Sequence, residues 1–160
     1  MRRLLPMVLA AVICLVGAGL TSAFAAAQIA EEQTIVLSEH TVRGRATLDL
    51  VGNPDAYNAG DRYIFRSVLR DADELQVGQM FVDCTVHFAK RDACSHVYDL
   101  EGRGTITALG MIPVSQLKLG GTWQLAITGG TGEFENVGGS TTVVIVDDAG
   151  NSEHSLHLLP

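Results

Sequence analysis

Short runs in which apolar and polar residues alternate recur along most of the chain. The clearest spans residues 77–88. Every second residue there is apolar, and these residues share one face: Val82, Cys84, Val86 and Phe88. A repeat of two residues is typical of a strand with one buried face. We therefore expect residues 77–88 to form a half-buried β-strand.

Six further runs are typical of strands, and clusters of glycine and polar residues that favour turns separate them. They are residues 34–37, 62–69, 105–108, 123–128, 141–146 and 155–158. Beyond residue 25 the chain shows no sustained repeat of 3.6 residues, so the pattern indicates an all-β fold. Closure of the sheet into a barrel would remove its exposed edges.

The run at residues 141–146 is apolar on both of its faces. Such a strand needs cover on both sides. A packed or ligand-bearing barrel interior would cover the inner face. The outer face would be covered either by a neighbouring subunit or by other parts of the same chain, and the pattern leaves both alternatives open.

The glycine-rich stretch at residues 126–139 raises the question of a phosphate-binding loop. No lysine follows its glycines, and the third glycine of a dinucleotide fingerprint is missing. Glu133 and Glu135 would also repel a phosphate. We therefore expect a turn at the end of the barrel, in which Gly129, Gly130 or Gly132 adopts a positive φ.

The N-terminus has the pattern of an export signal. Arg2 and Arg3 precede an apolar segment that ends at Leu20, and alanines at residues 23 and 25 fit a signal-peptidase site. Residues 1–25 are therefore predicted to be a signal peptide, with cleavage before residue 28 as a near alternative. A retained membrane anchor is the competing interpretation. Residues 26–160 would then form a single secreted β-barrel domain.

The formal net charge is −7, and the lysines and arginines are scattered along the chain. Nucleic acids and anionic membrane surfaces require clustered basic residues. We therefore expect no nucleic-acid partner, and no membrane partner after signal cleavage.

After signal cleavage only Cys84 and Cys94 remain. An even pair in an exported protein predicts a disulfide, and the alternative is two buried free thiols. In the chain-entropy model, closing so short a loop stabilises the fold by roughly 2–3 kcal/mol. Two cysteines without further ligands nearby do not complete a tetrahedral shell, so we expect no metal site.

Two other pairs of polar residues are interpreted as structural. His154 and His157 have the spacing of a helical metal site, but residues three apart in a strand face opposite sides. Glu101 and Arg103 are expected to share a strand face as a surface ion pair.

Three motifs together resemble the allene oxide cyclase and dirigent barrel superfamily. They are LAITGGTGEF at residues 125–134, GDRYIF at residues 60–65, and VG followed by DCTV within residues 77–86. The resemblance implies an eight-stranded antiparallel β-barrel, often a homotrimer, with an internal pocket for a small apolar molecule. It also implies that no metal or organic cofactor is needed, since these proteins act mainly by holding a substrate in a chosen conformation.

The resemblance also implies which residues line the pocket. Ser67 stands where the plant cyclases carry a pocket asparagine, and residues 35–37 of the first strand offer no acidic residue in place of the one in those pockets. No catalytic residue is assigned. The expected pocket residues are Tyr63, Phe65, Ser67, Val82, Cys84 and Val86.

Two functions remain open at this point. The first is a secreted barrel that binds a small hydrophobic molecule and guides its cyclisation or isomerisation; if the protein is an enzyme, it would be a cofactor-free isomerase or cyclase. The second is a non-catalytic exported protein whose barrel interior is packed. A lumen with a cavity of roughly 300 Å³ or more would favour the first.

Overall fold

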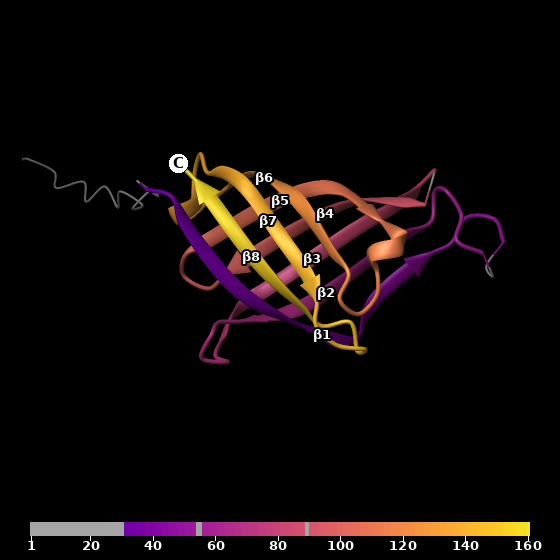
Figure 1. Ribbon diagram of the computed structural model, residues 1–160, viewed down its shortest axis with the longest axis horizontal. Helices are drawn as coiled ribbons and strands as arrows, with labels where there is room; N and C mark the ends of the chain where they lie inside the picture. The colour runs from indigo at the N-terminus through magenta and orange to yellow at the C-terminus, as the bar shows by residue number, and fades with distance from the viewer. Residues whose placement is uncertain (1–30, 54–55, 89) are drawn as a thin grey trace, which may run out of the picture.

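Eight antiparallel strands close into one barrel (Figure 1). The computed structural model describes residues 31–53, 56–88 and 90–160, so the predicted signal peptide at residues 1–25 lies outside the described residues. The strands are β1 (Gln33–Asp49), β2 (Arg62–Arg70), β3 (Gln76–His87), β4 (Arg91–Leu100), β5 (Gly104–Pro113), β6 (Thr122–Gly130), β7 (Gly138–Ile145) and β8 (Ser152–Leu159). The predicted all-β, eight-stranded antiparallel barrel is confirmed.

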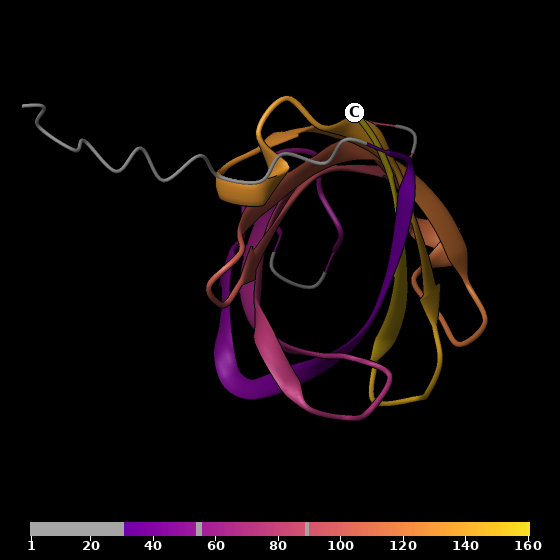
Figure 2. The same ribbon diagram turned by 90° about the vertical axis from the view of Figure 1, so that its left-hand side faces the viewer.

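Each strand pairs with the strands next to it in sequence, and β1 pairs with β8 to close the barrel (Figure 2). Two single 3₁₀ turns interrupt the meander, Val114–Gln116 after β5 and Gly132–Phe134 after β6. Within the described residues, neither helical turn has the length and hydrophobicity needed to cross a bilayer.

The alternation seen in the sequence corresponds to inward- and outward-facing residues. In β3, Met80, Val82, Cys84 and Val86 are all buried. Phe88 does not join them, because β3 ends at His87 and the Phe88 side chain is 84% exposed in the following turn. The sequence-based assignment of Phe88 to the buried face is therefore wrong.

The glycine-rich stretch forms the connection between β6 and β7, as predicted. Gly129 and Gly132 have φ values of 144° and 65°, which side-chain-bearing residues rarely adopt. Gly132 also passes close to the β4–β5 turn, since an added Cβ would lie 2.4 Å from the carbonyl oxygen of Arg103. This turn therefore needs glycine for both conformation and space.

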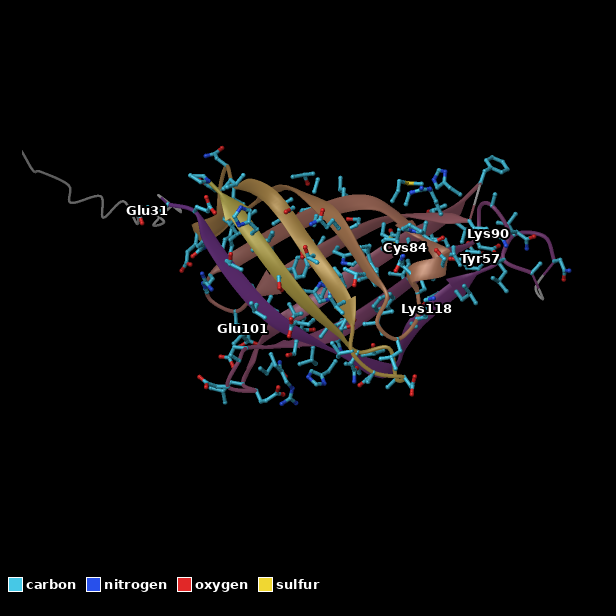
Figure 3. The ribbon with its side chains drawn as sticks, in the orientation of Figure 1. Glu31, Tyr57, Cys84, Lys90, Glu101 and Lys118 are labelled. Atoms are coloured by element: carbon cyan, nitrogen blue, oxygen red, sulfur yellow. A yellow bond between two sulfur atoms is a disulfide. The ribbon has the colours of Figure 1, made fainter. Side chains whose placement is uncertain are left out.

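One end of the barrel interior is packed and the other is hollow. The packed end contains large apolar side chains that are almost fully buried: Leu37, Leu69, Met80, Ile106, Phe134 and Leu158. Tyr57 and Cys84 lie toward the opposite end (Figure 3). The cavity described below lies toward the end that carries Tyr57.

Candidate functional site

A cavity of about 340 Å³ occupies the open end of the barrel. All eight strands contribute residues to it, and most of its wall is apolar or aromatic. Its lining includes Glu39, Thr41, Tyr57, Tyr63, Phe65, Cys84, His96, Ile112, Trp123, Ile145 and Ser152.

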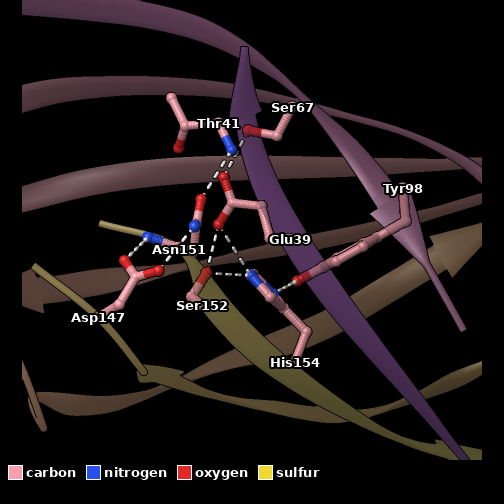
Figure 4. Close-up of polar contacts among 8 residues, drawn as sticks. All are labelled: Glu39, Thr41, Ser67, Tyr98, Asp147, Asn151, Ser152 and His154. Atoms are coloured by element: carbon pink, nitrogen blue, oxygen red, sulfur yellow. Dashed lines mark hydrogen bonds and ion pairs between the residues drawn. The ribbon is translucent and has the colours of Figure 1, made fainter. Parts of the chain in front are cut away.

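Glu39 on β1 lies at the inner end of this cavity and is only 5% exposed. Ser67 of β2 donates a hydrogen bond to Glu39 Oε1 at 2.5 Å. Ser152 of β8 donates to Oε2, and His154 Nε2 lies 3.2 Å from the same oxygen (Figure 4). The carboxylate is thus held from both neighbouring strands.

His154 is completely buried behind Glu39 and has partners on both ring nitrogens. The Tyr98 hydroxyl lies 2.9 Å from Nδ1, and the Ser152 hydroxyl lies 2.8 Å from Nε2 (Figure 4). Ser152 and His154 are two positions apart on β8, so the strand repeat places both on the inner face. The row from Tyr98 to Glu39 therefore fixes the orientation of the carboxylate.

The surroundings of Glu39 favour its ionised form. Burial alone would raise the pKa of Glu39, but the hydrogen bond and charge of His154 lower it, as do the hydrogen bonds from Ser152 and Ser67. The net effect is a pKa below the ordinary value for glutamate. Glu39 is therefore a carboxylate at neutral pH, in a position that water hardly reaches.

A second buried carboxylate, Asp92 of β4, lies near the mouth. It is fully buried, and the hydroxyls of Tyr57 and Tyr63 both donate to its Oδ2, the latter at 2.7 Å. Burial and Asp92 raise the pKa of both phenols, so they stay protonated as donors. Phe65 lies parallel to Tyr63, with ring centroids 6.4 Å apart, and extends the aromatic wall.

Cys84 and Cys94 are joined by a disulfide in the wall of the cavity, between directly paired residues of β3 and β4. The ring of His96 lies beside it, with a ligating atom within 4.8 Å of both sulfurs. Burial and the neighbouring His154 lower the pKa of His96 to about 3, so its imidazole is neutral. With the sulfurs bonded to each other, this cluster offers no thiolate to a metal.

Two polar atoms in the cavity wall lack a partner. His96 Nδ1 and Trp123 Nε1 are buried and make no hydrogen bond within the described part of the chain. Buried polar groups are normally satisfied. Both residues line the cavity, and these two atoms are left without a partner in its wall.

The structure places the six expected pocket residues on inward-facing positions, but at different depths. Tyr63, Phe65 and Cys84 line the cavity. Ser67 and Val82 are buried deeper, and Ser67 contacts Glu39. Val86 lines a separate groove beside Tyr57 at the mouth. A ligand contact by any of these residues stays a prediction.

Sequence reasoning missed Glu39, although a signal for it existed. The apolar run at residues 34–37 marks only the start of the first strand, and it contains no acid. β1 in fact continues to Asp49, and Glu39 is two positions after the buried Leu37, on the same inner face. Residues 35–37 offer no acid, as stated, but the same strand supplies an inward one two positions later.

Two further expectations concern polar pairs. His154 is buried while the His157 side chain is 43% exposed and lies 3.5 Å from Glu32, so the two histidines do face opposite sides. Arg103 does not pair with Glu101. Its Nε donates to Glu133 at 2.8 Å instead, because residues 101–103 form a turn and not a strand.

The chain is similar to one known protein family and to several solved structures. The family model of the allene oxide cyclase barrel like domain matches residues 33–156. No curated protein matches the sequence. Among solved structures, a pyocyanin demethylase is 28% identical with a TM-score of 0.65, over 79% of this chain and 100% of that one.

Other similar structures are more distant in sequence. An exo-specific intermolecular Diels-Alderase is 16% identical with a TM-score of 0.66, over 80% of this chain and 98% of that one. A pterocarpan synthase dirigent protein is 16% identical with a TM-score of 0.60, over 80% of this chain and 86% of that one. These two show the shared fold. Since the family model covers β1 to β7 and most of β8, the chain belongs to the allene oxide cyclase barrel-like family.

Proposed function

We propose that the open end of the barrel binds one small, largely apolar ring compound and that Glu39 transfers a proton within it. The observation that carries this proposal is an ionised carboxylate, 5% exposed, at the inner end of a cavity of about 340 Å³ with aromatic walls. Burying such a group is costly unless it is well paired. Three residues hold Glu39 in place, and one side of it faces the cavity.

The proposed reaction is an isomerisation or cyclisation that needs no other reactant. A Glu39 oxygen takes a proton from a weakly acidic carbon of the bound molecule, and the same carboxyl returns it to another atom of that molecule. The molecule thus changes its bonding but not its composition. Ser67, Ser152 and His154 act as positioning residues, and the cavity wall selects the reacting conformation. No metal or organic cofactor is part of this scheme.

The comparisons support the class of ligand. The structure with 28% identity is that of a pyocyanin demethylase. The aromatic rings of Tyr63, Phe65 and Trp123 would suit a flat ring system. We therefore propose planar heteroaromatic compounds as the first class to test.

The competing function is a non-catalytic barrel with a packed interior. The cavity lies within the usual size range of ligand pockets, roughly 300–1,000 Å³. Buried polar atoms without partners in its wall, on His96 and Trp123, also suit a site that receives a ligand. These features favour the ligand-binding proposal.

Trp123 makes the proposal testable, because it is the single tryptophan of the chain and lines the cavity. We expect pyocyanin and related planar heterocycles to quench its fluorescence saturably. Incubation in D₂O should then introduce deuterium into a bound compound, measured by mass spectrometry. Removing a general base typically costs 10²–10⁴-fold, so Glu39→Gln should slow this exchange by about that factor while the compound still binds.

Asp83→Asn is the matched control, because Asp83 is a carboxylate on the outer face of β3 that pairs with Arg62. Its exchange rate should equal that of the wild type. Saturable binding with equal exchange in Glu39→Gln and wild type would refute the role of Glu39. Failure of every planar compound to alter Trp123 emission would refute the binding site.

We further propose that the protein is exported, with residues 1–25 removed and residues 26–160 forming the mature domain. The disulfide between Cys84 and Cys94 is compatible with an oxidising compartment. N-terminal sequencing of protein recovered outside the cytoplasm should start near residue 26. A cell-associated form that retains residues 1–20 would contradict export.

A further inference from the structure

We propose that the cavity selects a positively charged ring compound over a neutral or anionic one of the same shape. This inference rests on the proposed function, since it concerns the ligand of the same site, and it specifies the charge of that ligand. It comes from the balance of charged groups around the cavity.

The acidic residue in the described part of the cavity wall has its ion-pair partner behind it and not within the cavity. Among the described side chains that line the cavity, Glu39 is the acidic one and none belongs to a lysine or arginine. The His96 ring in the wall is neutral, so it does not offset this charge. The partner that Glu39 does have is His154, on the side away from the cavity mouth.

Asp92 adds a second carboxylate directly behind the aromatic wall. Its Oδ2 accepts hydrogen bonds from Tyr57 and Tyr63, but its Oδ1 is buried and has no partner among the described residues. No described arginine, lysine or histidine forms an ion pair with it. Within the described part of the chain, Asp92 Oδ1 is therefore an unused hydrogen-bond acceptor behind the aromatic wall.

The aromatic residues of the wall are suited to the same ligand. Tyr57, Tyr63, Phe65 and Trp123 all line the cavity. A ring face attracts a cation by about 0.5–1 kcal/mol at exposed sites and about 2 kcal/mol when water is excluded. Because Asp92 accepts from both tyrosine hydroxyls, it holds these two rings in place and strengthens their negative potential. A cation in the cavity would therefore meet aromatic faces on its sides and a carboxylate at its inner end.

The basic residues at this end of the barrel do not reverse the balance. Lys90 and Lys118 lie at the same end as Tyr57 (Figure 3), and Arg91 begins β4. All three are exposed to solvent and none lines the cavity. Salt screens exposed charges much more than buried ones. The buried carboxylates therefore dominate the potential inside the cavity.

The test uses three bicyclic probes of one shape: 1-methylquinolinium (cationic), 1-methylnaphthalene (neutral) and 1-naphthoate (anionic). Affinities are measured by equilibrium dialysis, which does not depend on the optical properties of the probes. We expect the cation to bind at least tenfold more tightly than the neutral probe, and the anion to bind more weakly than either.

Variants assign this selectivity to the two carboxylates. Glu39→Gln and Asp92→Asn should each lower the ratio of cation to neutral affinity severalfold while the affinity for 1-methylnaphthalene stays within about twofold. Asp83→Asn on the outer face of β3 should leave the ratio unchanged. Retained binding of 1-methylnaphthalene shows that a variant has kept its cavity. If Asp92→Asn fails to fold, the ratio of cation to neutral affinity in the wild-type protein still decides the proposal.

The outcomes separate this inference from the proposed function. Equal binding of the cationic and neutral probes, or tighter binding of the neutral one, would overturn the selectivity and leave the ring-binding site intact. Tight binding of 1-naphthoate would overturn it as well. If none of the three probes binds, the proposed ring-binding site fails, and the selectivity fails with it.

Discussion

Buried polar side chains on four strands distinguish the open half of the barrel from the packed half. Glu39, Ser67, His96, Ser152 and His154 are each at most 5% exposed, in a region that could have been filled with leucine and valine. Replacing such a cluster by apolar residues is often neutral or stabilising in other proteins. We therefore attribute these residues to ligand binding and proton transfer, and not to stability.

The pH dependence of stability tests whether burying His96 lowers the free energy of unfolding. Its pKa is lowered to about 3 in the folded state from the usual 6.5, mainly by burial. The unfolded chain therefore binds a proton more readily, and the stability that is complete above pH 6.5 decreases as the pH falls toward 3. Between pH 6.5 and pH 5 the free energy of unfolding should drop by about 2 kcal/mol from this residue, at about 1.4 kcal/mol per pKa unit.

Denaturant unfolding at several pH values checks this expectation. His96→Phe should remove that part of the pH dependence, because phenylalanine does not titrate. His157→Phe is the matched control on the outer face of β8, and it should keep the wild-type slope. Identical slopes for the wild type and His96→Phe would show that His96 does not resist protonation in the fold.

At the level of single residues, the two-residue repeat of the strands predicted which side chains face inward. It did not predict which of them form the buried polar cluster of the cavity. The inward positions of β2 and β3 could be predicted because their residues are mostly apolar or aromatic, as with Tyr63 and Val82. His96 could not be recognised, since a polar residue on an inner face looks like a solvent-facing one. Strand parity with Leu37 could have placed Glu39 on the inner face, but its hydrogen-bond partners lie on other strands, and pairing between strands is not visible in a single sequence.

Among the elements, the turn between β6 and β7 depends most closely on its sequence. Gly132 has a φ of 65°, and an added Cβ would lie 2.4 Å from the Arg103 carbonyl oxygen. Gly132→Ala should therefore lower the free energy of unfolding by about 2–4 kcal/mol through strain and overlap.

Gly138 at the start of β7 is the matched control for this substitution. An added Cβ there would meet no atom within 4 Å, and Gly138→Ala should change stability by less than about 0.5 kcal/mol. Thermal or urea unfolding compares the two variants. Equal stability of both would mean that the turn adapts to a side chain, and the requirement for glycine would be refuted.

The sequence predicts some strands better than others. Seven of the eight strands overlap with runs seen in the sequence, although β1 is much longer than its run, and β4 was missed. Its inward residues include Asp92 and His96, and its outward residues include Ala93 and Val97, so polar and apolar residues do not separate by face. The strand that carries the buried Asp92 and His96 is thus the one with the weakest pattern.

For the whole molecule, the predicted homotrimer remains to be tested. The outer face of β2, β3 and β5 carries exposed apolar side chains, among them Ile64 (39%), Phe81 (43%) and Leu109 (45%). Exposed apolar patches often mark contacts between subunits. We expect light scattering after gel filtration to give three times the mass of the chain, and Leu109→Lys to shift the mass toward that of the monomer.

Leu48→Lys is the control for the subunit contact, because Leu48 is an exposed apolar residue (61%) near the mouth of the barrel and away from this face. It should keep the oligomeric state of the wild type. A monomeric mass for the wild-type protein at micromolar concentration would refute the trimer.

The closure of the barrel by β1 and β8 also brings the two ends of the domain together, since Gln33 is paired with Leu158 (Figure 1). The order of the strands around the barrel therefore does not depend on where the chain begins. A short glycine linker from Pro160 to Gln33, with new ends opened between His87 and Arg91, would give a circular permutant with the same strand neighbours. In that permutant Cys84 lies close to the new C-terminus and Cys94 close to the new N-terminus. The disulfide would then join the two ends covalently, making a continuous ring of a chain that had been cut.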